Sequence, residues 1–260
     1  MAPFYKAAAA VCLVAVYGLQ SEATGPTTTY EFKAVDVDKE AYVAANLVRN
    51  GKLAVHINEV AKDDSLVSGL KEKVEPKNAA KGGAQTVDSC DALIKASNLA
   101  GIFNHTSEYV ESPNYRTLLQ AALDAGLGVF KAKGYQNKWN EIWEDASGAN
   151  LAYLLGSNST SIGCVIGTCN KVVTPEERSP VSPQVSPEKT VLFCILNPAA
   201  ENGKAPFDEE YFNELVARTA KLAEMTEDDL KAPSNDGTAA AAIPTVLAAG
   251  FVSMLAALSA

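Results

Sequence analysis

The placement of the cysteines constrains the fold of this chain more than any other feature. The chain has 260 residues and 5 cysteines, and Cys90, Cys164, Cys169 and Cys194 lie in its central part. An even number of cysteines in an oxidising compartment most simply forms two disulfide bonds. These four cysteines allow three different pairings. A zinc site is the alternative, but the wide spacing of Cys164 and Cys169 and the lack of a nearby His argue against it.

The N-terminal end, residues 1–23, has the pattern of a secretory signal peptide. Lys6 supplies a positive charge, and Ala7 to Tyr17 form an uncharged run too short to span a bilayer. Ser21-Glu22-Ala23 places small residues at the positions that a cleavage site requires. An N-terminal membrane anchor is the alternative. We expect cleavage before Thr24, which also removes Cys12.

The C-terminal end is also apolar, with no charged residue after Asp236. Small residues, a short spacer and a terminal apolar tail are the parts of a GPI-attachment signal. Asn235 is the expected attachment residue because it leaves Gly237 at the second position after it, and Ser234, Asp236 and Gly237 are alternatives. A membrane helix or a buried helix in the tail are the rival interpretations. The predicted organisation is a signal peptide 1–23, an ectodomain 24–235 and a propeptide 236–260.

Charge and histidine content exclude several classes of function. A net charge of -9 argues against a nucleic-acid partner, because phosphates require clustered Lys and Arg. The chain has only 2 histidines, His56 and His105, and it lacks both a Gly-x-Ser-x-Gly motif and a phosphate-binding loop. We therefore expect no catalytic residue, no metal site and no cofactor.

The pattern of apolar residues predicts helices, then strands, then a final helix. Apolar segments without a helical period lie at 150–155 and 161–168, and 190–196 is the clearest strand. This order indicates an α+β fold with helices covering an antiparallel sheet. The predicted helices are 38–50, 64–73, 90–99, one that begins at Ser112-Pro113 and includes Leu127, 138–144 and 208–225.

A proline-rich segment, 171–189, separates the last two apolar segments. Close prolines disfavour regular structure, so we expect an extended, exposed loop here. This loop would join two antiparallel strands, with Cys164 and Cys169 on one and Cys194 on the other. Since loops on rigid scaffolds carry binding, it is the candidate contact loop. Its four prolines are Pro175, Pro180, Pro183 and Pro187.

Three further features have simple structural interpretations. Trp139 and Trp143 are expected to pack on the sheet, although a ligand-stacking platform is an alternative. The acidic runs 208–210 and 227–229 are expected to begin helices rather than to bind calcium. Asn104-His105-Thr106 and Asn158-Ser159-Thr160 are N-glycosylation sequons, which favours exposed loops at Asn104 and Asn158.

Several segments resemble the CAP superfamily, which includes plant pathogenesis-related proteins and venom allergens. They are Ser161-Ile-Gly-Cys-Val-Ile-Gly-Thr-Cys, Val191-Leu-Phe-Cys-Ile-Leu-Asn-Pro198 and Asn202-Gly203. Asn46 and Arg49, followed by Asp64 and Leu66, are similar to the opening helix of that family. The resemblance implies a three-layer αβα sandwich. It also implies that Cys164 pairs with Cys194, as the strand interpretation suggests too, and that Cys90 pairs with Cys169.

The chain is still more similar to the coccidian (Eimeria-type) GPI-anchored surface antigens, the SAG family. The N-terminal signal, the entry Pro206-Phe207-Asp208-Glu209-Glu210 to the last helix and the apolar tail carry this resemblance. It implies a non-enzymatic antigen on the outer face of a parasite plasma membrane. Such a protein would act in host-cell attachment, and its partners would be a host-cell ligand and antibodies.

One departure from the CAP pattern affects function. Many CAP proteins hold a metal between two His and two Glu, with one His in a Gly-His segment, but here the comparable place reads Gly148-Ala149-Asn150. Glu141 matches one carboxylate at most, so the resemblance implies no CAP-type metal centre. The alternative function that the resemblance leaves open is a secreted CAP-like carrier of sterol or another lipid.

Overall fold

The computed structural model of the chain describes residues 25–75, 87–97, 100–136, 138–176 and 180–231. The predicted signal peptide, Asn235, the propeptide 236–260 and the predicted loop 77–84 lie outside these residues. Within them, no helix is both long enough and apolar enough to cross a bilayer. The elements in chain order are β1 (Thr27–Asp36), α1 (Lys39–Asn50), β2 (Ala61–Lys62), α2 (Asp64–Val74), α3 (Cys90–Ala96), β3 (Phe103–Glu108), α4 (Tyr115–Lys133), α5 (Trp139–Glu144), α6 (Ala146–Leu154), β4 (Ser161–Thr174), β5 (Gln184–Asn197), α7 (Glu209–Ala217), and the 3₁₀ turns η1 (Leu222–Glu224) and η2 (Glu227–Leu230).

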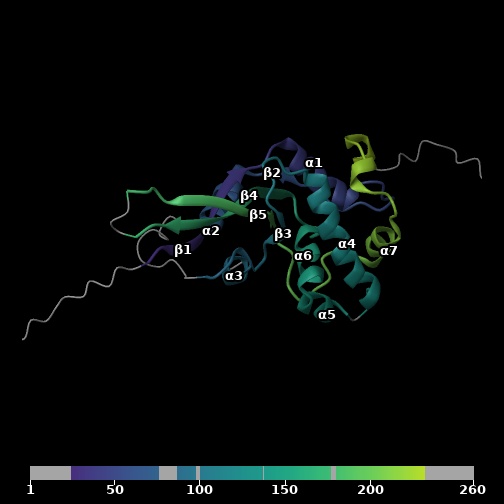
Figure 1. Ribbon diagram of the computed structural model, residues 1–260. Coiled ribbons are helices and arrows are strands. Elements are labelled where there is room, and N and C mark those ends of the chain that lie inside the picture. The colour runs from purple at the N-terminus through teal and green to yellow at the C-terminus, as the bar shows by residue number, and fades with distance from the viewer. Residues whose placement is uncertain (1–24, 76–86, 98–99, 137, 177–179, 232–260) are drawn as a thin grey trace, which may run out of the picture.

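One sheet organises the molecule, with the strand order β1-β4-β5-β3. All neighbours in this order are antiparallel, and the short β2 pairs in parallel with the start of β4. The two central strands form a long hairpin in which Ser161 lies opposite Asn197 and Val173 lies opposite Gln184. Figure 1 shows this hairpin projecting away from the helical half of the molecule.

Helices cover both faces of the sheet, which gives three layers. Helices α1, α4 and α6 share a core with the face that carries Cys164 and Leu192. Helices α2 and α3 share a second core with the face that carries Val165 and Phe193. Successive residues of β4 are buried because alternate side chains enter the two cores. The predicted α+β fold, with helices covering an antiparallel sheet, is confirmed.

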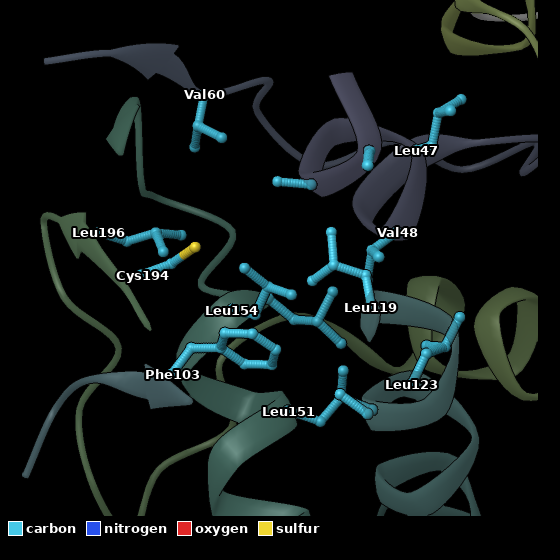
Figure 2. Close-up of a cluster of buried hydrophobic side chains, with 14 of the residues drawn as sticks. Leu47, Val48, Val60, Phe103, Leu119, Leu123, Leu151, Leu154, Cys194 and Leu196 are labelled. Carbon is cyan, nitrogen blue, oxygen red and sulfur yellow. The ribbon is translucent and has the colours of Figure 1, made fainter. Parts of the chain in front are cut away.

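The larger core fills the space between the sheet and the helices on that face. Figure 2 shows side chains from α1, α4 and α6 converging on Phe103 of β3 and Leu196 of β5. These residues are almost completely buried, as interiors packed at crystal-like density require. The labelled helix residues are Leu47, Val48, Leu119, Leu123, Leu151 and Leu154.

The helices at the N-terminal end begin where the capping residues predict. Asp38 caps α1 by accepting from the Glu40 amide, and Asp63 caps α2 by accepting from the Ser65 amide. Helix α4 differs, because the Ser112-Pro113 start is wrong by two residues. Asn114 is the N-cap and accepts from the Thr117 amide. Asn is as good a cap as Ser, so the sequence offers two starts close together.

The expectation of a non-helical apolar segment at 150–155 is wrong, because α6 covers most of it. Asp145 caps this helix by accepting from the amides of Ser147 and Gly148. Leu151, Leu154 and the following Leu155 are buried together with Ala152. A helix that is apolar on nearly all sides shows no clear period, and the cap is its remaining signal.

The predicted helix 208–225 is also too long, because α7 ends at Ala217. Arg218 leaves the helical conformation, and the chain then makes the two short turns η1 and η2. The guanidinium of Arg218 donates to carbonyls of α1 instead of facing solvent. The tertiary contact therefore overrides the helical pattern. The predicted helix 90–99 ends at Ala96, somewhat earlier than expected.

The loop predicted for 171–189 is shorter in the structure. Strand β4 continues to Thr174 and β5 begins at Gln184, so Pro187 lies within a strand. Pro187 lies beyond the end of β3, next to a register shift, and both places tolerate a missing amide proton. Strands β1 and β3 were not expected, because they are mostly polar edge strands with little alternation.

Candidate interaction surface

Two disulfide bonds fix the elements that carry the hairpin. Cys164 and Cys194 lie directly opposite each other on β4 and β5, with Cα atoms 4.2 Å apart. Cys90 at the start of α3 is bonded to Cys169 on β4, with Cα atoms 5.9 Å apart. All four residues are buried. These are the pairs that the CAP resemblance implies, and each face of the sheet contains one of them.

The outer half of the β4–β5 hairpin is the exposed part of this braced scaffold. Val181 and Val185 are 55% and 57% exposed, more than the other exposed large apolar residues Val35, Tyr109 and Val110. Val181 and Val185 lie in the same segment as three exposed prolines of the predicted contact loop, while the fourth proline, Pro175, is half-buried. The exposed prolines are Pro180, Pro183 and Pro187. Val181, Val185 and these three prolines form the candidate contact surface.

Contacts from β1 and from the end of β3 hold the stem of the hairpin. Strand β1 pairs along β4 as far as Thr27, which lies opposite Thr174. Beyond β3, the Tyr109 amide donates to the Glu188 carbonyl, and the Val110 amide donates to the Thr190 hydroxyl. Lys189 also pairs with Glu108, and this contact raises the pKa of the Lys189 ammonium. The hairpin is therefore an extension of the sheet.

Polar residues of α1 hold the segment that follows this helix. Asn46 makes two hydrogen bonds with the main chain of Val60, and Asn50 makes two with Ile57. Arg49 is fully buried and donates to the carbonyls of Asn58, Leu154 and Gly156. Burial lowers the pKa of its guanidinium to about 10, so it stays charged at neutral pH. Asn46 and Arg49 are the residues that resemble the opening helix of CAP proteins. In this structure their side chains form hydrogen bonds with main-chain atoms of neighbouring segments.

The C-terminal segment 218–231 is fixed to the same helical half. Arg218 donates to the carbonyls of Leu47, Val48 and Gly51 at the C-terminal end of α1. The Tyr211 hydroxyl donates to the Arg49 carbonyl, and burial raises the pKa of this phenol. Cations at the C-terminal end of a helix satisfy carbonyls that have no partner within the helix. Further along, Arg116 donates to the carbonyls of Leu222 and Met225.

Trp139 and Trp143 were expected to pack on the sheet, but in the structure they do not. Trp139 lies in an aromatic cluster with Phe130 of α4 and with Phe207 and Phe212 near α7. Trp143 packs on Tyr153, and its indole donates to the Lys204 carbonyl. Both tryptophans belong to α5, and this helix packs among other helices instead of on the sheet. Since both indoles are buried, neither presents a stacking platform.

The two histidines lie on different elements. His56 is in the segment after α1, and its Nε2 lies 2.9 Å from the Leu53 carbonyl oxygen. His105 is in β3, and burial lowers its pKa. In the described part of the chain, neither ring has a hydrogen bond or ion pair to a Ser, Asp or Glu side chain.

The acidic residues weighed as ligands have structural partners. Glu141 pairs with Lys138 and Lys133, and these hydrogen bonds lower the pKa of its carboxyl to about 2. Asp208 caps α7, and Asp229 closes a capping box at η2. Among the described residues, no group of three or more His, Cys, Asp or Glu side chains is arranged to hold a metal ion.

The two sequons differ in their surroundings. Asn158 is exposed in the turn between α6 and β4. Asn104 was expected in an exposed loop, but it lies half-buried in β3, opposite Phe193. A shallow depression between the end of α1 and η2 is open to solvent and is lined by Lys52, Leu53, Ala54, Asp228, Asp229 and Lys231.

Comparisons with known proteins find similar solved structures, including a parasite surface antigen and a hookworm inhibitor. No family model matches the chain. No curated protein matches it either. The surface antigen protein SAG19 of Eimeria tenella is 18% identical, with a TM-score of 0.43, and the match covers 74% of this chain and 100% of that chain. Hookworm platelet inhibitor is 15% identical, with a TM-score of 0.37, and the match covers 67% of this chain and 79% of that chain.

Proposed function

We propose that this chain is a non-enzymatic binding module on the outer face of the plasma membrane. A GPI lipid at Asn235 holds it there, and its hairpin contacts a host-cell ligand and antibodies. The observation that carries the proposal is the pair of buried disulfides, because such bonds persist in oxidising compartments and are rare in the cytosol. They fit an extracellular or surface protein, as does the signal-peptide pattern of residues 1–23.

The positions of the hairpin and of the C-terminal segment support this orientation. In Figure 1, the hairpin points to the left, and the yellow-green segment that ends at Lys231 lies at the opposite end of the molecule. Arg218 and Arg116 fasten that segment to the body. A lipid at Asn235, a few residues further along the chain, would therefore hold Val181 and Val185 away from the membrane.

The exposed valines provide the test of this contact surface. Cells that display the full-length chain are incubated on host-cell monolayers, and adhesion is counted for the wild type and for the double variant Val181→Glu, Val185→Glu. Charges on an apolar contact remove buried area and add a desolvation cost, so we expect adhesion to fall at least tenfold.

Val35→Glu is the matched control, because Val35 is 43% exposed but lies at the other end of the sheet, opposite Ile166. Its adhesion should equal that of the wild type at equal surface expression. Equal adhesion of the double variant and the wild type would show that the hairpin is not the contact surface.

A further inference from the structure

We propose that Asn158 carries an N-linked glycan and that the sequon at Asn104 stays unmodified in the folded protein. The inference rests on the part of the proposed function that sends the chain through the secretory pathway. An N-linked glycan is attached to the side-chain nitrogen of Asn in Asn-x-Ser/Thr, and its bulk must lie in solvent after folding. The surroundings of the two asparagines decide between them.

Asn158 is the exposed apex of a firmly held turn. The Ser157 amide donates to the Pro206 carbonyl, and the Thr160 amide donates to the Asn197 carbonyl. Ser159 is buried, and its hydroxyl donates to the Pro198 carbonyl over 2.6 Å. Within the described residues, the side-chain amide of Asn158 makes no hydrogen bond. The turn thus presents a free amide nitrogen to solvent, and a glycan there displaces no contact.

Asn104 has the opposite environment. Its side-chain nitrogen donates to the Ile102 carbonyl over 3.3 Å, inside a half-buried strand. Its main chain is held on the outer edge of β3 by Asn150, which accepts from the Asn104 amide and donates to the Asn104 carbonyl. The cross-strand partner is Phe193, which is fully buried. A glycan on Asn104 would have to leave from a half-buried strand position, where the side-chain nitrogen already contacts the Ile102 carbonyl.

The position of Asn158 also gives the glycan a consequence for binding. Asn158 precedes the first residue of β4, and the hairpin turn follows the last residue, Thr174. At about 3.3 Å per residue, the strand separates the two places by up to about 45 Å. A glycan at Asn158 therefore leaves Val181 and Val185 uncovered while it occupies the other end of the strand.

The test uses the full-length chain in a eukaryotic cell line, once with its own residues 1–23 and once with the signal sequence of a protein that this line secretes. Tryptic peptides are treated with N-glycosidase in heavy-oxygen water, and mass spectrometry reads the occupancy at each sequon. We expect label at Asn158 and none at Asn104. Thr160→Ala and Asn158→Gln should each abolish the glycosidase-sensitive shift on a gel.

Two variants are matched controls. Ser159→Ala removes the buried hydrogen bond but keeps the sequon, so its shift should remain. Thr106→Ala destroys the sequon at Asn104 and should leave the shift unchanged. Label at Asn104, or secreted protein from the substitute-signal arm without label at Asn158, overturns the inference. If only the substitute-signal arm enters the pathway and is labelled at Asn158 alone, the proposed location fails, while the assignment of Asn158 rather than Asn104 as the accessible sequon stands.

Discussion

Arg49 is completely buried although it is charged, and its contacts are all carbonyl oxygens. A buried cation requires partners that replace its hydration, and three carbonyls from two segments supply them here. The residue therefore joins α1, the segment before β2 and the end of α6. Its role is structural, and the resemblance that drew attention to Arg49 did not reveal which carbonyls it contacts.

Replacing Arg49 tests this role. In Arg49→Met, the carbonyls of Asn58, Leu154 and Gly156 lose their donors, so we expect unfolding free energy to fall by about 3 kcal/mol. Lys131→Met is the control, since Lys131 is exposed and its loss should change stability by less than about 0.5 kcal/mol. Urea denaturation measures both variants. Equal midpoints for the two would contradict the assignment.

His105 predicts a component of the pH dependence of stability. Burial lowers its pKa in the folded state, so the unfolded state binds the proton more readily. The contribution of neutral His105 to the free energy of unfolding is therefore fully present above about pH 6.5, the ordinary pKa of His. It is lost as the pH falls through the lowered folded-state pKa. His105→Gln should lose less stability than the wild type between pH 7.5 and pH 5, measured by thermal melting. The same loss in both proteins would refute the role of His105.

At the scale of elements, side chains close the two edges of the sheet. Glu75 accepts from the Ala34 amide on β1, and Asn150 pairs with the main chain of Asn104 on β3. Unpaired strand edges invite association with other chains, and both contacts satisfy edge groups within the molecule. These contacts join residues that are far apart in sequence, so they leave no local pattern from which they could be predicted.

The close contact of α4 and α6 yields a paired glycine test. A Cβ on Gly126 would lie 2.4 Å from the Cβ of Leu151, whereas a Cβ on Gly128 would meet nothing within 4 Å. Gly126→Ala should therefore lower stability by about 1–3 kcal/mol through overpacking. Gly128→Ala should raise it by about 0.5–1 kcal/mol, because Ala favours the helix. Equal changes of the same sign in the two variants would contradict the observed packing.

The sequence predicts elements well where local signals agree. Helix α1 has an apolar face and a following glycine, and 64–73 also has an apolar face, so both were predicted closely; in the structure an aspartate caps each of them. Helix α6 was missed because burial on nearly all sides removes the helical period. The proline-rich loop was predicted correctly to join two antiparallel strands, but its length was overestimated because an edge and a bulge accommodate Pro187.

Across the molecule, one disulfide bond joins α3 to β4 and the other joins β4 to β5. Cys90 and Cys169 are 79 residues apart, and Cys164 and Cys194 are 30 apart. Loop-closure entropy assigns them about 4.5 and about 3.6 kcal/mol respectively. We therefore expect Cys90→Ala, Cys169→Ala to lower the melting temperature more than Cys164→Ala, Cys194→Ala, as calorimetry can measure. The reverse order would show that packing around the hairpin bond outweighs chain entropy.

The central claim is display of this disulfide-braced domain outside the cell on a lipid, and release from intact cells tests it most directly. Cells expressing the full-length chain are treated with phosphatidylinositol-specific phospholipase C, and the supernatant is analysed by non-reducing mass spectrometry. We predict released protein with both disulfides intact and a C-terminal peptide that ends at or beside Asn235. Retention on the cells, or a chain that still ends at Ala260, would contradict the claim.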